Sequence, residues 1–179
     1  MGVRMSGDGV VVKQIKPKKL REDAMRLTLL NAMRAFGTEM KKEFEKTTRT
    51  WKHKPKFEII RALSANLGKV EVAVMTDDEI YGYVNNGTKE HIIEPKKPGG
   101  KLFFIWGGPG SYTPKTTPGV IGSQSGSNSG EPTARAWVLH PGSEARNFDK
   151  AVGDLMEPRF KTKMEQAMKE AAQKSGHKA

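Results

Sequence analysis

The chain has 179 residues, with 31 lysines and arginines against 20 aspartates and glutamates, and its formal net charge of +11 favours acidic partners. It contains no cysteine, which excludes disulfide bonds and thiolate metal sites and fits a reducing cytosol. No apolar run approaches the roughly 20 residues of a membrane span, and the polar N-terminus does not resemble a secretory signal, so we expect no membrane association.

The length predicts one domain, residues 20–174, preceded by an N-terminal arm of residues 1–19. Within this arm, Val10, Val11 and Val12 predict a short strand or an extended segment. Hydrophobic residues make up only 36% of the chain, below the share of about 45–50% that is usual for globular domains. Part of the chain is therefore expected to lie outside the core.

Residues 21–46 carry the strongest helical pattern. Apolar side chains recur there at intervals of three and four residues, which places them on one helix face: Met25, Leu29, Met33, Phe36, Met40 and Phe44. We interpret this face as a core contact. Packing against another subunit is the alternative, because methionine adapts readily to different surfaces.

A basic stretch follows at residues 41–56. Its cations Lys46, Arg49, Lys52 and Lys54 surround Trp51, a combination suited to phosphate contact and base stacking. The alternative is a solvated helix end, where the helix dipole favours cations in any case. The stretch is therefore a candidate for contact with DNA or with an acidic partner.

Two segments predict an antiparallel hairpin. Residues 57–63 contain β-branched side chains, and residues 69–75 alternate strictly, with valines 70, 72 and 74 on one face. The acidic residues 77–79 are expected to cap the following turn and to begin a short helix. Further strands are predicted at residues 102–106 and 136–139.

The segment between those last two strands, residues 107–135, is predicted to be a long irregular loop. Glycine, proline, serine and threonine dominate it, and such a composition cannot bury enough apolar surface to fold alone. Structureless loops longer than about 15 residues are usually functional or disordered. We expect Val120 and Ile121 to anchor this loop, which can order against a neighbouring subunit.

The chain is predicted to be helical again from Phe148 onward. Pro158 separates two apolar stripes, so we expect a kink or two helices, followed by a frayed tail at residues 175–179. Together the elements predict an α+β fold. In it, a long N-terminal amphipathic helix and a C-terminal helix pack on a small antiparallel sheet that carries a long loop insertion.

Patterns typical of enzymes are weak in this chain. The glycine-rich segments lack the ending of a phosphate loop, and no serine lies in a nucleophile-elbow frame. His91 and His140, with Glu90 or Glu94, remain candidates for a metal or acid–base site. We expect no enzymatic activity, no metal and no cofactor, and a hydrolase or metal enzyme built on these histidines is the weakest alternative.

Two short motifs combine turn and strand signals. The first contains the turn Asn85-Asn86-Gly87-Thr88, after Tyr81 and Tyr83, which could pack on a sheet edge. His91 then restarts an extended segment that ends at Pro95. The second motif is a strand ending in the turn His140-Pro141-Gly142, and we expect the His140 ring to bond to the backbone of the first turn. Both motifs are expected to shape the fold.

The ordered set of these motifs resembles the HK97-type neck, or tail-completion (minor tail), family of long-tailed bacteriophages. Members of that family have an amphipathic helix, then a Tyr-containing segment that ends in Gly-Thr and leads to a His and an apolar-Pro stretch. A strand ending in His-Pro-Gly precedes their C-terminal helix. The matching positions here are Tyr83, Gly87, Thr88, His91, Ile93, Pro95, His140, Pro141, Gly142 and Phe148. The chain departs from the pattern in its 107–135 insertion and its basic stretch.

The resemblance implies a non-enzymatic virion protein of the head–tail junction, made in the host cytoplasm. Its implied partners are further copies of itself in a closed ring of six- or twelve-fold symmetry, with head-closure and tail-terminator or tail-tube proteins on either side. The candidates for contacts with other subunits or partners are Val10, Val11, Val12, Val120 and Ile121.

The resemblance also gives the positive charge two possible partners. The basic surface would face either DNA in the lumen of the ring or acidic neighbouring proteins. The alternative function is that of a small basic nucleic-acid-binding protein that uses residues 41–56.

Overall fold

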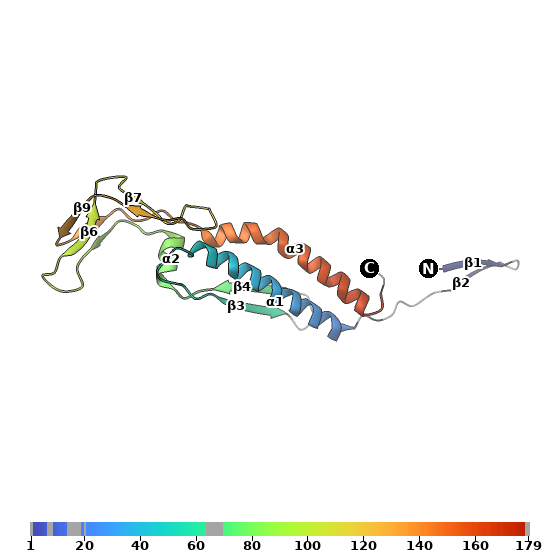
Figure 1. Ribbon diagram of the computed structural model, residues 1–179. Coiled ribbons are helices and arrows are strands. Elements are labelled where there is room, and N and C mark those ends of the chain that lie inside the picture. Colours follow the sequence, from blue (N-terminus) through green and yellow to red (C-terminus); the bar gives the residue numbers. More distant parts are fainter. Residues whose placement is uncertain (1, 7–8, 14–18, 20, 64–69, 178–179) are drawn as a thin grey trace.

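The computed structural model describes residues 2–6, 9–13, 19, 21–63 and 70–177. The fold is α+β, as predicted, with two long helices side by side and small two-stranded antiparallel sheets (Figure 1). In chain order the elements are β1 (Gly2–Ser6), β2 (Gly9–Lys13), α1 (Glu22–Thr47), β3 (Glu58–Leu63), β4 (Val70–Met75), α2 (Glu79–Asn86), β5 (His91–Ile93), β6 (Leu102–Trp106), β7 (Tyr112–Thr113), β8 (Ser127–Asn128), β9 (Glu131–Arg135), β10 (Val138–His140) and α3 (Phe148–Lys174).

Helix α1 forms where the apolar stripe predicts it, and the stripe faces the interior of the same chain. Leu29, Met33 and Phe36 are buried, while Met40 and Phe44 are partly buried against the core. The helix lies along α3 (Figure 1). The prediction of an intrachain core contact is therefore confirmed.

Strands β3 and β4 form the predicted antiparallel hairpin, which packs against α1. The register pairs Ile59 with Val74, and strict alternation turns Val72 and Val74 toward the helices, where both are partly buried. The connection between the two strands, residues 64–69, lies outside the described residues.

The core consists of two clusters along the helices. One joins Phe36 of α1 to Val152 and Met156 of α3. The other joins Phe57, Tyr81 and Phe148, whose rings lie 5.2 Å (Phe57 to Tyr81) and 5.8 Å (Tyr81 to Phe148) apart between centroids. Tyr81 thus lies inside the core on α2, not on a sheet edge as expected, and Tyr83 on the same helix is exposed.

Helix α3 tests two predictions about the C-terminal part of the chain. It is a single helix that contains Pro158, so the alternative of two helices is wrong, whereas α3 bends along its length, in line with the alternative of a kink (Figure 1). The helix can continue because Pro158 lies on the exposed side, where water can satisfy the backbone carbonyl that proline leaves unpaired. Ser175 is buried, and its hydroxyl donates to the Ala171 carbonyl at 2.9 Å and accepts from the Arg21 amide at 3.3 Å. The predicted fraying is therefore wrong at Ser175, which ties the end of α3 to the start of α1.

Beyond α2, residues 88–143 form a β-extension that projects past one end of the helices (Figure 1). In it β5 pairs with β10, β6 with β9, and β7 with β8, all antiparallel. The predicted irregular loop 107–135 thus contains β7, β8 and β9. Its glycine- and proline-rich sequence hides β9, whose five residues pair along the whole of β6.

Strands β1 and β2 form a separate antiparallel hairpin in the N-terminal arm. The register pairs Val3 with Val12 and Met5 with Val10, so Val10, Val11 and Val12 lie in a strand. Their side chains are outside the described part of the structure, and their predicted role in partner contact stays a prediction.

Candidate functional site

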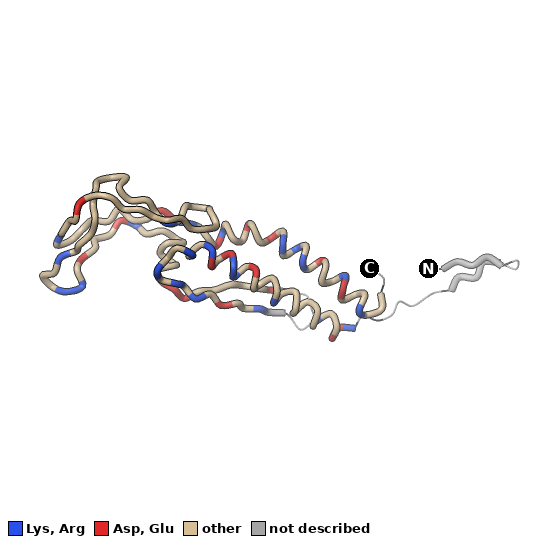
Figure 2. Tube along the Cα trace, in the orientation of Figure 1, with Lys and Arg blue, Asp and Glu red and all other residues tan. Residues whose placement is uncertain are grey.

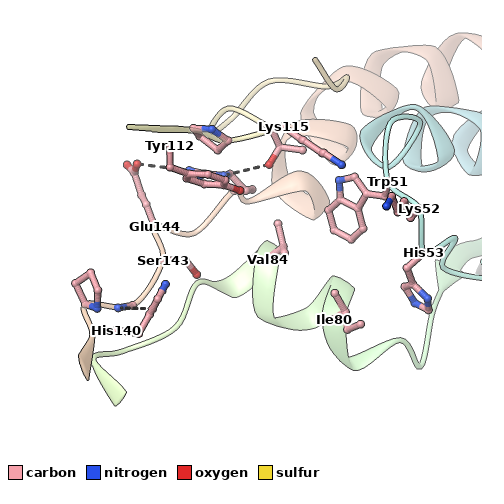
Figure 3. A pocket seen from close by; sticks show the side chains of 15 residues that line it. Trp51, Lys52, His53, Ile80, Val84, Tyr112, Lys115, His140, Ser143 and Glu144 are labelled. Atoms are coloured by element: carbon pink, nitrogen blue, oxygen red, sulfur yellow. Dashed lines mark hydrogen bonds and ion pairs between the residues drawn. The ribbon is translucent and has the colours of Figure 1, made fainter. Parts of the chain in front are cut away.

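A groove lies where the β-extension joins the helices, and it has a volume of about 830 Å³. Its walls come from residues 51–53 after α1, from α2, from β7 and the residues that follow it, and from the end of β10 and the segment that leads to α3 (Figure 3). The first turn motif lies beside this groove, and His140, Pro141 and Gly142 of the second motif line it. The contacts around the groove therefore show how the two motifs are held.

One side of the groove is apolar. Ile80 and Val84 rise from α2 toward it, and Trp51 lies next to them (Figure 3). The Trp51 ring packs 6.3 Å from that of Tyr81, between centroids. Burial raises the pKa of Tyr81, so its hydroxyl stays neutral beneath the groove.

The polar side of the groove holds cations that are already engaged within the chain. Arg146 donates from Nε to the Thr116 hydroxyl at 3.3 Å and lies 3.6 Å from a Glu144 carboxylate oxygen. Lys115 donates from Nζ to the Thr50 carbonyl at 3.5 Å. These contacts fasten the β7–β8 segment and the chain before α3 to the end of α1, and they leave Lys52 as an exposed cation at the rim.

Across the groove, His53 and Asp78 fix the start of α2. Asp78 caps the helix, as predicted for the acidic residues 77–79, by accepting from the Tyr81 amide at 2.8 Å, and its other oxygen contacts His53 Nε2. Desolvation raises the pKa of Asp78, but the hydrogen bonds from His53 and the backbone outweigh it, so the pKa lies below its ordinary value.

The two turn motifs lie against each other and form one structural unit. The Thr88 amide donates to the Ser143 carbonyl at 3.0 Å, and the Ser143 amide donates back to the Thr88 carbonyl at 3.0 Å. Gly87 and Gly142 have φ of 73° and 89°, the left-handed region that favours glycine. A Cβ on Gly87 would stand 2.6 Å from the Ser143 carbonyl oxygen, so both turns need glycine to approach this closely.

His91 and His140 meet across β5 and β10, with ring centroids 5.1 Å apart. His91 Nδ1 donates to the Lys89 carbonyl at 2.8 Å, and the Gly142 amide donates to His140 Nδ1 at 3.1 Å. The His140 ring therefore bonds within its own turn, to the Gly142 amide, and not to the backbone of the first turn as expected. Among the described residues, no three His, Cys, Asp or Glu side chains are placed to hold a metal ion.

The other positions of the two motifs also have structural surroundings. Pro95 follows β5 and is partly buried, whereas Pro141 follows β10 and lines the groove. Phe148 begins α3 and is fully buried in the core. Gly87, Thr88 and Gly142 thus lie where the β-extension joins the helices, whereas Tyr83 is exposed on α2.

Three members of the basic stretch have contacts within the chain. Lys46 donates to Glu43 at 2.7 Å, and Lys54 donates to the Thr48 and Arg49 carbonyls at the end of α1. Trp51 packs against the core. Arg49 and Lys52 are exposed, and the contacts described here assign them no ion pair.

The β-extension exposes an unusual amount of apolar surface. Phe103 is 80% exposed and Tyr112 64%, and four further large apolar side chains on these strands are at least 41% exposed. We call the following residues the apolar extension surface: Ile92, Phe103, Ile105, Trp106, Tyr112, Trp137 and Leu139. The sequence of residues 102–106 predicts a strand but not its exposure; apolar residues on both faces of a strand without a covering helix are the signal that indicates it.

Val120 and Ile121, the predicted contact pair of the long segment, have different environments. Ile121 packs against the core cluster of Phe36, Val152 and Met156, so it anchors the segment within its own chain. Val120 is 52% exposed and remains available for contact with another molecule.

No protein-family model, curated protein or solved structure matches the chain. Its described helices include none that is long and apolar enough to cross a membrane.

Proposed function

We propose that the chain is a structural subunit of the head–tail connector of a tailed bacteriophage, a neck or tail-completion ring that joins tail to capsid. The observation that carries this proposal is the apolar extension surface, which projects from the helices and is covered by nothing in the described chain (Figure 1). Apolar patches of this kind mark protein–protein contacts. The order of the turn motifs resembles that of the neck family, and this resemblance is the reason for proposing the head–tail connector as the assembly.

The amount of apolar surface suits a stable contact. Aromatic side chains bury about 150–250 Å² each when covered. The four aromatic side chains of the set are each at least 51% exposed and, with its aliphatic side chains, they offer roughly 700 Å², close to the roughly 800 Å² per partner of a standard interface. A two-stranded sheet is also marginally stable alone, so the β-extension gains stability in an assembly.

In this role the chain has no catalytic function. Its partners are copies of itself in a six- or twelve-fold ring and the head-closure and tail-terminator or tail-tube proteins on either side, with DNA in the lumen. The protein is then located at the head–tail junction of the virion.

Two experiments test the proposal. The purified full chain, or the chain co-expressed with a neck partner, should form closed rings of uniform size by negative-stain electron microscopy and light scattering. Gold-labelled antibody should mark the head–tail junction of tailed particles that contain the chain. The proposal would be contradicted if the chain formed no ring either alone or with a neck partner. Labelling elsewhere on the particle would also contradict it.

A further inference from the structure

The β3–β4 sheet has an outward face that no described element covers. The register pairs Glu58 with Met75 and Ile60 with Ala73, and alternation turns these residues away from α1. Ile60 is 49% exposed and Met75 55%. α1 lies on one side of the hairpin only (Figure 1).

This outward face is apolar and acidic, although the chain as a whole is strongly basic. Its described side chains are Glu58, Ile60, Glu71, Ala73 and Met75, which include two carboxylates and neither lysine nor arginine. A net charge of +11 makes such a face unusual in this protein. Glu58 forms no ion pair among the described residues, so a surface that is apolar and basic complements this face.

The β-extension provides that complement. Phe103 and Ile105 share one face of β6, and they are 80% and 41% exposed. The connection between β5 and β6 carries three exposed lysines, Lys96, Lys97 and Lys101, which form no ion pair in the described chain. Figure 2 shows basic segments in this connection, at the free end of the β-extension.

We propose that the β-extension of one subunit lies on the outward face of the β3–β4 sheet of the next subunit. Phe103 and Ile105 cover Ile60, Ala73 and Met75, and the three lysines lie beside Glu58 and Glu71. Within one chain the β-extension projects away from the sheet, so the two surfaces meet between molecules (Figure 1).

The proposed contact joins two different surfaces, so each subunit can bind one neighbour through its sheet and another through its β-extension. Such head-to-tail contacts close into rings when the rotation between subunits allows. Closure into a ring rests on the proposed neck function, whereas the contact between two copies is tested separately.

Charge reversal on each surface provides the test. The face variant E58K/E71K should repel the lysines of its neighbour, and the extension variant K96E/K97E/K101E should repel the carboxylates. Each variant alone should raise the dissociation constant of self-assembly about tenfold or more, because like charges across an interface oppose association. Mixed one to one, they should assemble again, since every contact in an alternating assembly then joins opposite charges.

A matched control separates this effect from a change in net charge. E157K/E165K reverses two exposed carboxylates on α3 and adds the same charge as E58K/E71K. It should assemble like the wild type, and all variants should keep the wild-type thermal unfolding temperature. Wild-type assembly by the face or extension variant alone would overturn the proposal, as would a mixture that fails to assemble.

Cross-linking tests the contact even where no stable ring forms. The chain has no cysteine, so M75C and K97C each introduce a single thiol. A bifunctional maleimide at low salt should join M75C to K97C when the two proteins are mixed, and it should join M75C far less well to a K161C control. If the mixed product does not form, the proposed contact is wrong. Rings formed by the same protein would still support the neck proposal. The mixed product without rings would support the contact and contradict the ring.

Discussion

Gly142, in the turn after β10, lies so close to the carbonyl oxygen of Thr88 that a Cβ at position 142 would overlap it. The two residues come from the two turn motifs, which are separated by the whole of the β-extension. The backbone bonds between Thr88 and Ser143 close this extension at its base. The motifs are therefore the joint between the β-extension and the helices, and their glycines allow the two chain segments to touch.

We expect Gly142→Ala to destabilise the protein by about 1–3 kcal/mol, because a side chain at φ 89° is strained and the new methyl group would strike the Thr88 carbonyl. Urea unfolding of the full chain measures the change. Gly82→Ala is the matched control: it lies in α2, and a Cβ there meets no atom within 4 Å, so it should be neutral or stabilising. Equal losses from both substitutions would show that the joint is not as described.

The pH dependence of stability should reveal Asp78. Its pKa is lowered by His53 and by the backbone bonds of the α2 cap, so its stabilising effect is complete above the unfolded pKa of about 3.9 and is lost as the pH falls through the folded value. Asp78→Ala should cost about 1 kcal/mol at neutral pH, through the lost cap.

Asp78→Asn separates the charge from the cap, because asparagine keeps a capping oxygen. It should lose less stability than Asp78→Ala at neutral pH. Its difference from wild type should begin to shrink below about pH 4, where Asp78 becomes protonated in the unfolded chain, and should be lost as the pH falls through the lowered pKa of the folded state. Thermal unfolding from pH 3 to pH 7 measures both effects. A difference that stays constant over this range would contradict the role of the Asp78 charge.

Much of the helical part could be predicted from the sequence, because its local patterns agree with its packing. The stripe through Leu29, Met33 and Phe36 has the period of a helix and faces the core. Strict alternation in Val70–Met75 identifies a strand with one buried face. Aspartate is a residue type that favours helix N-caps, and Asp78 caps α2.

The β-extension was harder to predict because its strands depend on pairing partners far away in the sequence. Nothing local in Glu131–Arg135 favours a strand, and Pro132 argues against one, yet β6 provides a full ladder. The acidic outward face is also invisible until the register brings Glu58 opposite Met75. Pro158 predicts a kink or two helices, and the sequence cannot decide between them because it does not show that the proline lies on the exposed side of α3.

Ile121 should hold the 107–135 segment against the helices. It packs on the cluster of Phe36, Val152 and Met156, so Ile121→Ala should cost about 1–2 kcal/mol, less than for a fully buried site. Hydrogen exchange should also quicken at the Gly119 amide, which donates to the Arg146 carbonyl at 2.8 Å. Val120→Ala, on the exposed neighbour, should change neither quantity, and a larger effect at Val120 than at Ile121 would contradict the anchor.

DNA binding should not depend specifically on the basic stretch. Lys46 and Lys54 have contacts within the chain and Trp51 packs on the core, whereas no described side-chain contact engages the exposed cations Arg49 and Lys52. We expect R49A/K52A to weaken low-salt binding of duplex DNA only as much as K161A/K169A, which removes two exposed lysines of α3.

If the stretch formed a DNA site, R49A/K52A alone would lower the slope of log K against log salt by about two, because each phosphate contact contributes about one counterion. Fluorescence anisotropy at several salt concentrations distinguishes the two results, and such a selective loss would favour the nucleic-acid-binding function over the neck proposal.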